Sequence, residues 1–199
     1  MKLYDVSASA NSRRVRVLCR ELQLPVELES VNLTVPRSPS YLENNPTGKV
    51  PTLVDDDGTV IWESGAILLH LAERRPEAGL LPAEARPRAE VFRWMFFCAT
   101  HVQPWLSVLG QERLLKPRLN QPVDEHAIAL AERELSRYLH VLDAALEGKQ
   151  HLVDGCYSLA DVFLGCSFEG AEARGVDVAA YPNVFDWRER LRRRVAWAD

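Results

Sequence analysis

The spacing of apolar residues changes near residue 75 of this 199-residue chain, and that change restricts the folds it can adopt. Before residue 75, short apolar or alternating stretches are separated by helical patterns and turns. These stretches predict strands over residues 2–6, 26–31, 50–54 and 59–62. After residue 75, apolar residues recur almost everywhere at helical spacing. The sequence therefore predicts an α/β unit followed by an all-helical unit.

Helices are expected between the strands of the first unit. Residues 11–24 predict one that Asn11 or Ser12 caps and Pro25 ends. Residues 64–73 predict another, and a short one is expected near residues 40–44. A strand, a helix and a second strand imply a parallel pair joined by a crossover, and a hairpin follows. The order βαβ, loop, ββα is that of a thioredoxin-like unit.

A stretch rich in Pro, residues 76–87, predicts a linker between domains at residues 1–75 and 88–199. Residues 88–110 are apolar nearly all round, so this helix is expected to be buried on more than one side. Pro104 should kink or end it.

Three further helices are expected in the second unit. Residues 124–146 carry a single apolar stripe. Ser158 and Asp161 form a capping box that opens the next helix. The last helix is expected from about Asn183, with Phe185 and Trp187 packing inward.

Charge and composition exclude several classes of protein. The net charge of −4 argues against a nucleic-acid partner, and the basic run at residues 188–194 is expected to be a solvated helix face. No apolar stretch is long enough to span a membrane or to act as a signal peptide, so the expected compartment is the cytoplasm. The four cysteines are scattered, which favours reduced, buried thiols over disulfides or a metal site.

Polar residues at two predicted helix starts are candidates for binding an anion. Ser9, Asn11 and Ser12 precede or open the first helix, where backbone N–H groups and the helix dipole would hold a thiol as its thiolate. Glu63 and Ser64 open the third helix and would together bind the carboxylate and amine of an amino acid. The alternative for both groups is a purely structural role as turn and cap residues.

Pro51 stands at the entrance of a predicted strand, where it cannot donate a ladder hydrogen bond. If the Val50–Pro51 bond is cis, the Val50 backbone groups are free to pair with an extended peptide. A trans proline that merely starts the strand is the alternative.

These stretches form an ordered set of motifs that resembles the glutathione transferase superfamily. The motifs are S-x-x-x-R-R-V from Ser9, N-P-x-G-K-V-P-x-L from Asn45, and E-S-x-A-I from Glu63. The resemblance continues through S-L-A-D and Y-P-N in the second half and so covers essentially the whole chain. It implies glutathione as co-substrate, no other cofactor and a homodimer.

The resemblance also implies roles for single residues. Ser9 matches the catalytic serine of the serine-type classes, and Asn11 and Ser12 are alternatives for the contact with sulfur. Val50, beside a cis Pro51, would pair with the cysteinyl backbone. Glu63 and Ser64 would hold the γ-glutamyl end of glutathione, and Lys49 could reach a carboxylate of the tripeptide. Arg37 is a weaker candidate, for the glycine carboxylate.

Departures from the family pattern narrow the expected chemistry. Position 9 is not cysteine, which argues against the thiol exchange of the cysteine-type classes, and Tyr4 lies inside a predicted strand, where it should serve packing. The expected function is transfer of glutathione to a small, apolar electrophile. A glutathione-dependent disulfide or peroxide reductase and a non-catalytic binding module are the alternatives.

The second unit is expected to bind the electrophile. His101, Phe97, Trp105 and Trp94 are candidates for lining that cleft, although a histidine on an apolar helix is more often a core residue.

Overall fold

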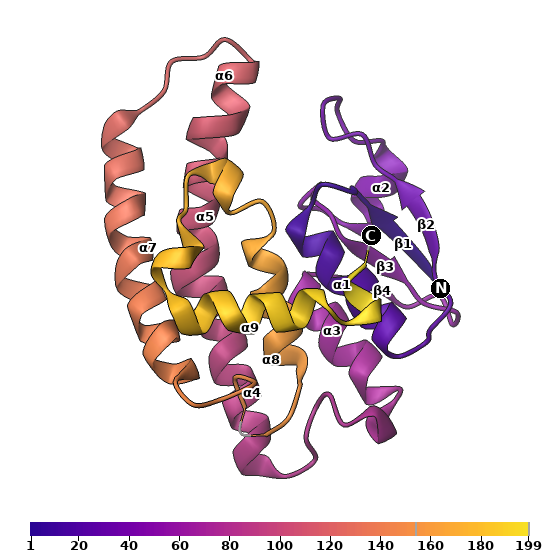
Figure 1. Ribbon diagram of the computed structural model, residues 1–199. Helices are drawn as coiled ribbons and strands as arrows, with labels where there is room; N and C mark the ends of the chain where they lie inside the picture. The colour runs from indigo at the N-terminus through magenta and orange to yellow at the C-terminus, as the bar shows by residue number, and fades with distance from the viewer. Residues whose placement is uncertain (154, 199) are drawn as a thin grey trace. The chain divides into compact units, whose positions relative to one another are not determined.

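Four short strands of the first unit form one mixed sheet in the order β2-β1-β3-β4 (Figure 1). The computed structural model describes residues 1–153 and 155–198. β1 (Lys2–Asp5) pairs in parallel with β2 (Glu27–Ser30) and antiparallel with β3 (Thr52–Val54), which forms a hairpin with β4 (Val60–Trp62). The thioredoxin-like order of elements expected from the sequence is therefore confirmed.

The three helices of this unit are α1 (Ala10–Glu21), α2 (Pro39–Asn44) and α3 (Ser64–Glu73). The predicted bounds of α3 are confirmed. The predicted cap of α1 was wrong, because neither Asn11 nor Ser12 caps it. Ser9 has extended backbone angles, and its hydroxyl accepts a hydrogen bond from the Ser12 N–H at 3.3 Å.

The sheet separates two layers of helices, and its register decides which side chains face each layer. Leu3 opposes Leu53, and both are fully buried. Most apolar side chains of α1 and α3 are also buried, and the two helices pack together. Tyr4 opposes Thr52 on the other face, where the Tyr41 hydroxyl of α2 lies 3.0 Å from Thr52 Oγ1. The rings of Tyr4 and Tyr41 meet edge to face at 5.2 Å, so Tyr4 does serve packing.

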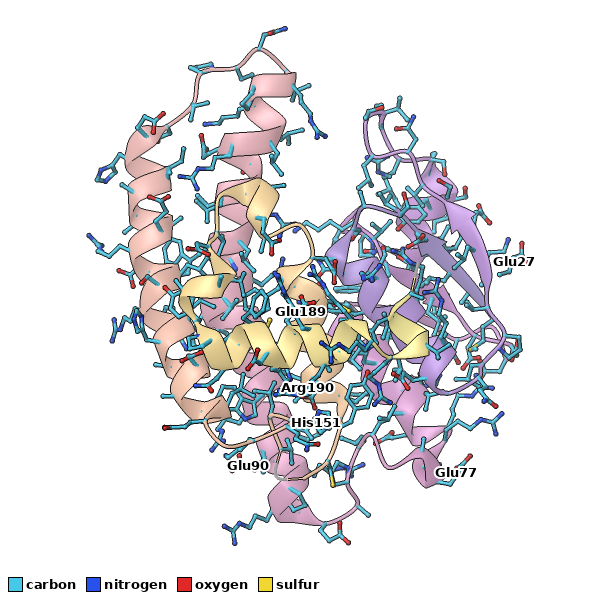
Figure 2. All side chains as sticks on the ribbon, viewed as in Figure 1. Glu27, Glu77, Glu90, His151, Glu189 and Arg190 are labelled. Carbon is cyan, nitrogen blue, oxygen red and sulfur yellow. The ribbon has the colours of Figure 1, made fainter. Side chains whose placement is uncertain are left out.

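β2 differs from its prediction. A half-buried strand was expected, yet all four residues of β2 are exposed, Leu28 at 51% of its surface. Glu27 points away from the sheet in Figure 2. β2 is an edge strand that neither layer of helices covers, so its alternating pattern marks no buried face.

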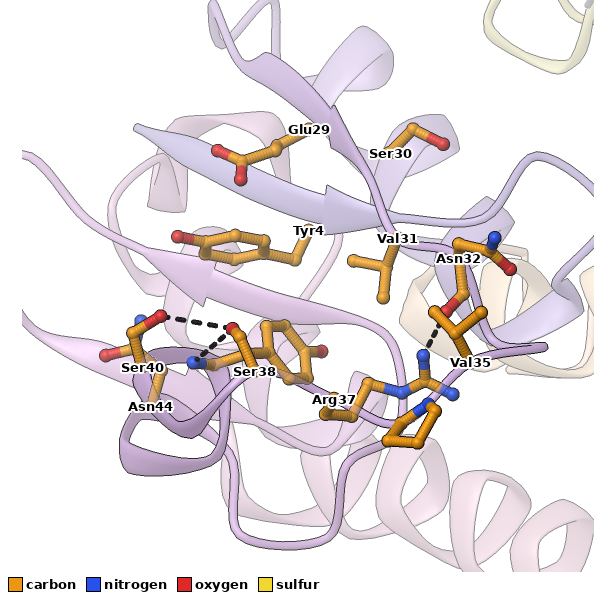
Figure 3. A pocket seen from close by; sticks show the side chains of 12 residues that line it. Tyr4, Glu29, Ser30, Val31, Asn32, Val35, Arg37, Ser38, Ser40 and Asn44 are labelled. Atoms are coloured by element: carbon orange, nitrogen blue, oxygen red, sulfur yellow. Dashed lines mark hydrogen bonds between the residues drawn. The ribbon is translucent and has the colours of Figure 1, made fainter.

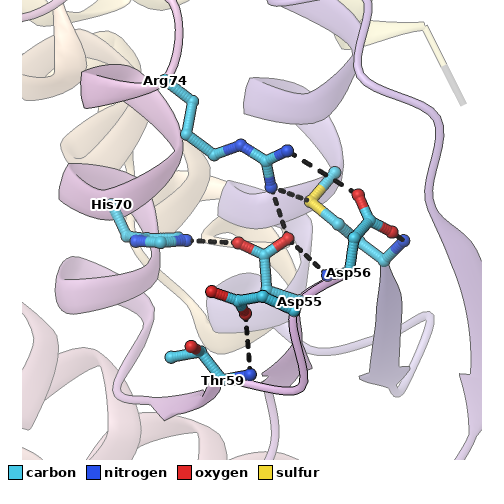
Figure 4. A network of polar contacts seen from close by, with 7 residues as sticks. Asp55, Asp56, Thr59, His70 and Arg74 are labelled. Atoms are coloured by element: carbon cyan, nitrogen blue, oxygen red, sulfur yellow. Dashed lines mark hydrogen bonds and ion pairs between the residues drawn. The ribbon is translucent and has the colours of Figure 1, made fainter.

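The turn between β3 and β4 is fastened to the end of α3 by ionic contacts (Figure 4). The Asp55 side chain is almost fully buried; its Oδ2 lies 2.6 Å from His70 Nε2, and its Oδ1 pairs with the guanidinium of Arg74. Burial alone would raise the pKa of Asp55, but hydrogen bonds from His70, the Asp56 N–H and Arg74 outweigh it and lower the pKa to about 2. These contacts fix α3 against the hairpin that precedes it.

The second unit, Ala83–Asp199, begins with a run of consecutive helical segments. These are α4 (Ala85–Phe97), the π-helix η2 (Cys98–Val102), α5 (Gln103–Gly110), the π-helix η3 (Gln111–Leu115) and α6 (Lys116–Arg118). One helix over residues 88–110 was predicted. Pro104 lies in the first turn of α5, where its missing N–H is tolerated, and a π-helical turn directly precedes it.

The burial of this run also differs from the prediction. Buried residues follow one face, and Phe96 is 67% exposed. Within a single copy of the chain, the run from α4 to α5 is therefore not buried on a second side.

The remaining helices are α7 (Glu125–Leu146), α8 (Leu159–Gly165) and α9 (Pro182–Arg192). The predicted apolar stripe of α7 is confirmed, since all six of its residues are buried: Ile128, Ala131, Leu135, Leu139, Leu142 and Leu146. The predicted capping box of Ser158 and Asp161 is present at the start of α8. Short 3₁₀ turns complete the fold at Pro76–Ala78, Cys166–Phe168, Glu172–Arg174, Val178–Ala180 and Val195–Trp197.

Three details of the C-terminal region correct the sequence analysis. Trp187 is fully buried as expected, but Phe185 is 37% exposed beside the guanidinium of Arg188. Arg188 is not part of a solvated face: it is buried and pairs with Glu172 at 2.5 Å. Cys156 is exposed, whereas the other three cysteines are buried, and all four are free thiols.

Within residues 1–153 and 155–198, no helix is long and apolar enough to cross a membrane.

Candidate functional site

The loop from β1 to α1 presents Ser9 at the N-terminus of a 12-residue helix. Ser9 is half-buried, and its oxygen accepts from the Ser12 N–H, so its own O–H remains able to donate. Ser12 is fully buried, and its oxygen accepts from the Val6 N–H at 3.5 Å. The geometry thus separates the two serines: Ser12 holds the loop, and Ser9 faces the helix start with a donor available to a ligand.

Arg16 fixes the same loop, a role that the sequence analysis missed. Its guanidinium donates to the backbone carbonyls of Ser7, at 2.8 Å, and Val6, at 3.4 Å, and it pairs with the buried carboxylate of Asp5. The side chains of Arg16 and Asp5 are only 11% and 9% exposed. Charged hydrogen bonds to two successive carbonyls leave this loop little freedom.

The Val50–Pro51 peptide bond is cis. β3 begins only at Thr52, and among the described residues no hydrogen bond reaches the N–H or C=O of Val50. The preceding Lys49 is held by its carbonyl, which accepts from Asn45 Nδ2 at 3.0 Å and from the Tyr41 hydroxyl, while its side chain is exposed. The segment therefore offers an unpaired backbone strand edge next to the exposed side chain of a lysine.

Glu63 and Ser64 stand where β4 passes into α3. Glu63 has φ 72° and ψ 118°, a region that side-chain-bearing residues rarely occupy. Such strain persists only where surrounding structure imposes it, and it gathers at binding and catalytic sites. Glu63 is exposed, Ser64 is 5% exposed, and no side chain caps the first turn of α3. The first N–H groups of α3 are thus left without a capping side chain.

Arg14 brings the starts of α1 and α3 together, and the sequence analysis missed it too. Its Nη1 lies 2.6 Å from Asn11 Oδ1 and 3.1 Å from Ser64 Oγ. Arg14 itself is only 2% exposed. Two of the motifs that the sequence placed about 50 residues apart therefore share one guanidinium nitrogen.

Two domain families match the sequence, and together they cover most of it. The N-terminal domain of glutathione S-transferases matches residues 3–79, and the C-terminal domain matches residues 92–194. The second match alone spans more than half of the chain. The chain belongs to the glutathione S-transferase superfamily.

Individual transferases and a related reductase are similar over nearly the full length. The disulfide-bond oxidoreductase YfcG of Escherichia coli K12 is 33% identical over 94% of this chain and 87% of its own. Glutathione S-transferase 3 of Zea mays is 32% identical over 99% and 91%. A sphingomonad glutathione S-transferase, solved in complex with glutathione, is 28% identical with a TM-score of 0.86, covering 99% of this chain and 95% of that one.

The remaining N-terminal candidate, Arg37, is engaged within the transferase fold. It donates to the carbonyls of Gly48, at 3.2 Å, Leu33, at 2.8 Å, and Asn32. A hollow of about 290 Å³ lies beside it, between the sheet and α2, lined among others by Tyr4, Glu29 and Ser38 (Figure 3). None of the other residues expected to bind glutathione lines this hollow.

In the transferase C-terminal unit, His101 lies in an aromatic cluster rather than in the core. It is exposed, and its ring stacks on Tyr138 of α7 at 4.7 Å and meets Phe97 at 5.7 Å. Phe97 in turn contacts Trp94 edge to face at 5.3 Å. Trp105 is half-buried on α5. Across residues 1–153 and 155–198, no group of three or more His, Cys, Asp or Glu side chains could hold a metal ion.

Proposed function

We propose that this chain binds glutathione in its first unit and transfers it to a small, apolar electrophile, with Ser9 as the catalytic residue. The observation that carries the proposal is the meeting of the α1 and α3 starts, since Arg14 contacts both Asn11 and Ser64. Each start can bind an anion, and glutathione carries a thiolate and a γ-glutamyl carboxylate to place there.

Different residues of the first unit bind different parts of glutathione. Ser9 donates its O–H to the sulfur, because Ser9 is half-buried at the helix start whereas Ser12 is fully buried. The unpaired N–H of Val50 donates a hydrogen bond to the backbone of the cysteinyl residue, and the C=O of Val50 accepts one from it, as in a pair of neighbouring strands. Ser64 binds the γ-glutamyl carboxylate and Glu63 its ammonium group, and the exposed Lys49 binds the glycine carboxylate.

This arrangement lowers the pKa of the bound thiol, since the helix start and the Ser9 O–H both favour the thiolate. The thiol proton leaves to solvent. The sulfur lone pair then forms the S–C bond while the bond from carbon to the leaving group breaks, and the leaving group departs with that electron pair. We assign the binding of the electrophile to the aromatic cluster of Phe97, His101 and Tyr138, in which the buried Trp94 supports Phe97 from below the surface.

Substitution of Ser9 tests the role of its hydroxyl. Ser9→Ala removes a hydrogen bond to a charged group, which corresponds to at least a roughly tenfold loss of conjugation rate, whereas glutathione binding survives through the other contacts. The measurement is conjugation of a chromogenic aryl halide, with glutathione affinity from calorimetry. Ser7→Ala, an exposed serine of the same loop, is the control. A Ser9→Ala enzyme as active as the parent would remove Ser9 from the mechanism.

A second candidate, glutathione-dependent disulfide reduction, is favoured by the similarity to the oxidoreductase YfcG. One bound thiolate would attack a disulfide and release a thiol, and a second glutathione would then release the other thiol as oxidised glutathione forms. The same bound thiolate serves both reactions. Conjugation and disulfide reduction assayed side by side on one preparation decide between them.

A further inference from the structure

The guanidinium of Arg14 makes hydrogen bonds that fix the orientation of two side chains at once. Its Nη1 donates to Asn11 Oδ1 at 2.6 Å and to Ser64 Oγ at 3.1 Å. These partners lie 3 and 50 positions away in the sequence. Arg14 is 2% exposed, so solvent does not compete for these contacts.

A guanidinium has donors and no acceptor, which determines what its partners can offer to a ligand. Ser64 receives a hydrogen bond on its oxygen, so its own O–H is left to donate. Asn11 receives one on its amide oxygen, so its orientation is fixed and its NH₂ group carries the remaining donors. Both side chains are therefore set as donors at the starts of two helices.

We propose that Arg14 is a positioning residue that turns Asn11 and Ser64 into hydrogen-bond donors for two anionic groups of one ligand, the thiolate and the γ-glutamyl carboxylate of glutathione. This inference rests on the proposed glutathione function. Arg14 acts through its two partners and couples the two ends of the site, so binding at one end is felt at the other.

The test compares Arg14→Met with Arg20→Met, which removes an exposed arginine from the same helix. Glutathione affinity is measured by calorimetry, and the pKa of the bound thiol by the ultraviolet absorbance of its thiolate across pH. Arg14→Met should weaken affinity about tenfold, as expected for charged hydrogen bonds, and should also raise the pKa of the bound thiol. Arg20→Met should change neither.

A double-variant cycle separates positioning from general support of the fold. Ser64→Ala should weaken affinity and should raise the pKa of the thiol by less than Arg14→Met does, because Arg14 still contacts Asn11. In the Ser64→Ala background, Arg14→Met should cost less affinity than it does alone, because part of its effect passes through Ser64. If the fold-loss of affinity in the double variant equals the product of the two single losses, the coupling is contradicted.

Should Arg14→Met fail to fold, Asn11→Ala and Ser64→Ala replace it in the cycle and leave the guanidinium in place. The inference then requires the double variant to bind at least about threefold more tightly than the product of the single effects predicts; independent effects overturn it. A parent protein that binds no glutathione refutes the proposed function itself. A parent that binds, beside a folded Arg14→Met variant with unchanged affinity and thiol pKa, refutes the role of Arg14 alone.

Discussion

At the scale of single residues, the buried carboxylate of Asp55 is the clearest source of pH-dependent stability. Its pKa falls from the usual 3.8 to about 2 in the folded chain, despite burial, because His70, the Asp56 N–H and Arg74 all favour the charged form. A lowered pKa stabilises the folded state at pH values above 3.8, and this contribution is lost as the pH falls through about 2.

Asp55→Asn should therefore lower the free energy of unfolding by about 2 kcal/mol at neutral pH, and the difference from the parent should shrink between about pH 5 and pH 2. Urea unfolding at several pH values measures it. Asp57→Asn, in the same turn but exposed, keeps an oxygen for the Thr59 N–H and should change stability little. A pH-independent loss in Asp55→Asn would contradict the ionic origin of the effect.

The sequence was informative about residues whose role depends on a local pattern. Ser9, Val50 and Ser64 were singled out because a helix start or an X-Pro bond is visible within a few neighbouring residues. The roles of Arg14 and Arg16 were not predicted because most of their partners lie outside α1. Ser64 opens α3, and the carbonyls of Val6 and Ser7 precede α1. An arginine within a run such as Arg13-Arg14-Val15-Arg16 looks the same whether it is solvated or buried.

At the scale of elements, the capping box of α8 joins several segments through one carboxylate. Asp161 is fully buried, and it accepts from the N–H groups of Leu152 and Ser158, at 3.1 and 2.9 Å, and from Trp187 Nε1 at 2.8 Å. Besides capping the start of α8, the box therefore fastens this helix to the preceding loop and to α9.

Replacing either member of the box should destabilise the protein, to different extents. Ser158→Ala removes one cap and should cost about 1 kcal/mol. Asp161→Ala leaves several buried donors without an acceptor and should cost about 3 kcal/mol or more. Thermal unfolding followed by circular dichroism compares the two. Similar losses in both variants would mean that Asp161 acts only as a cap.

Elements with a strong period were predictable, and those that break the period were not. α3 and α7 follow from unbroken apolar spacing, which their buried faces confirm. The π-helical turns at Cys98–Val102 and Gln111–Leu115 insert extra residues into a helical run. No residue type in the sequence predicts such a turn. The alternating pattern of β2 predicted one buried face, yet all four of its residues are exposed. Its place at the edge of the sheet, which the pattern does not reveal, leaves it uncovered.

At the scale of the whole molecule, we propose a homodimer that covers the exposed surface of α4. Phe96 is 67% exposed there, with Ala99 and Thr100 exposed one turn further on. A large exposed aromatic side chain is a common anchor of protein interfaces.

Phe96→Glu should accordingly convert a dimer to a monomer at micromolar concentration, with the dimer weakened at least about tenfold. Light scattering coupled to size-exclusion chromatography measures the mass. Phe185→Glu, at an exposed phenylalanine of α9, is the matched control and should remain a dimer. A monomeric parent, or a Phe96→Glu variant that stays dimeric, would exclude this interface.

The binding of glutathione with its sulfur at Ser9 is tested most directly by a crystal structure of the protein soaked with glutathione. We predict that the sulfur lies within about 3.5 Å of Ser9 Oγ, with the γ-glutamyl carboxylate at Ser64 and the cysteinyl backbone paired with Val50. A sulfur bonded to another group and out of reach of Ser9, or a first unit without bound glutathione, would contradict it.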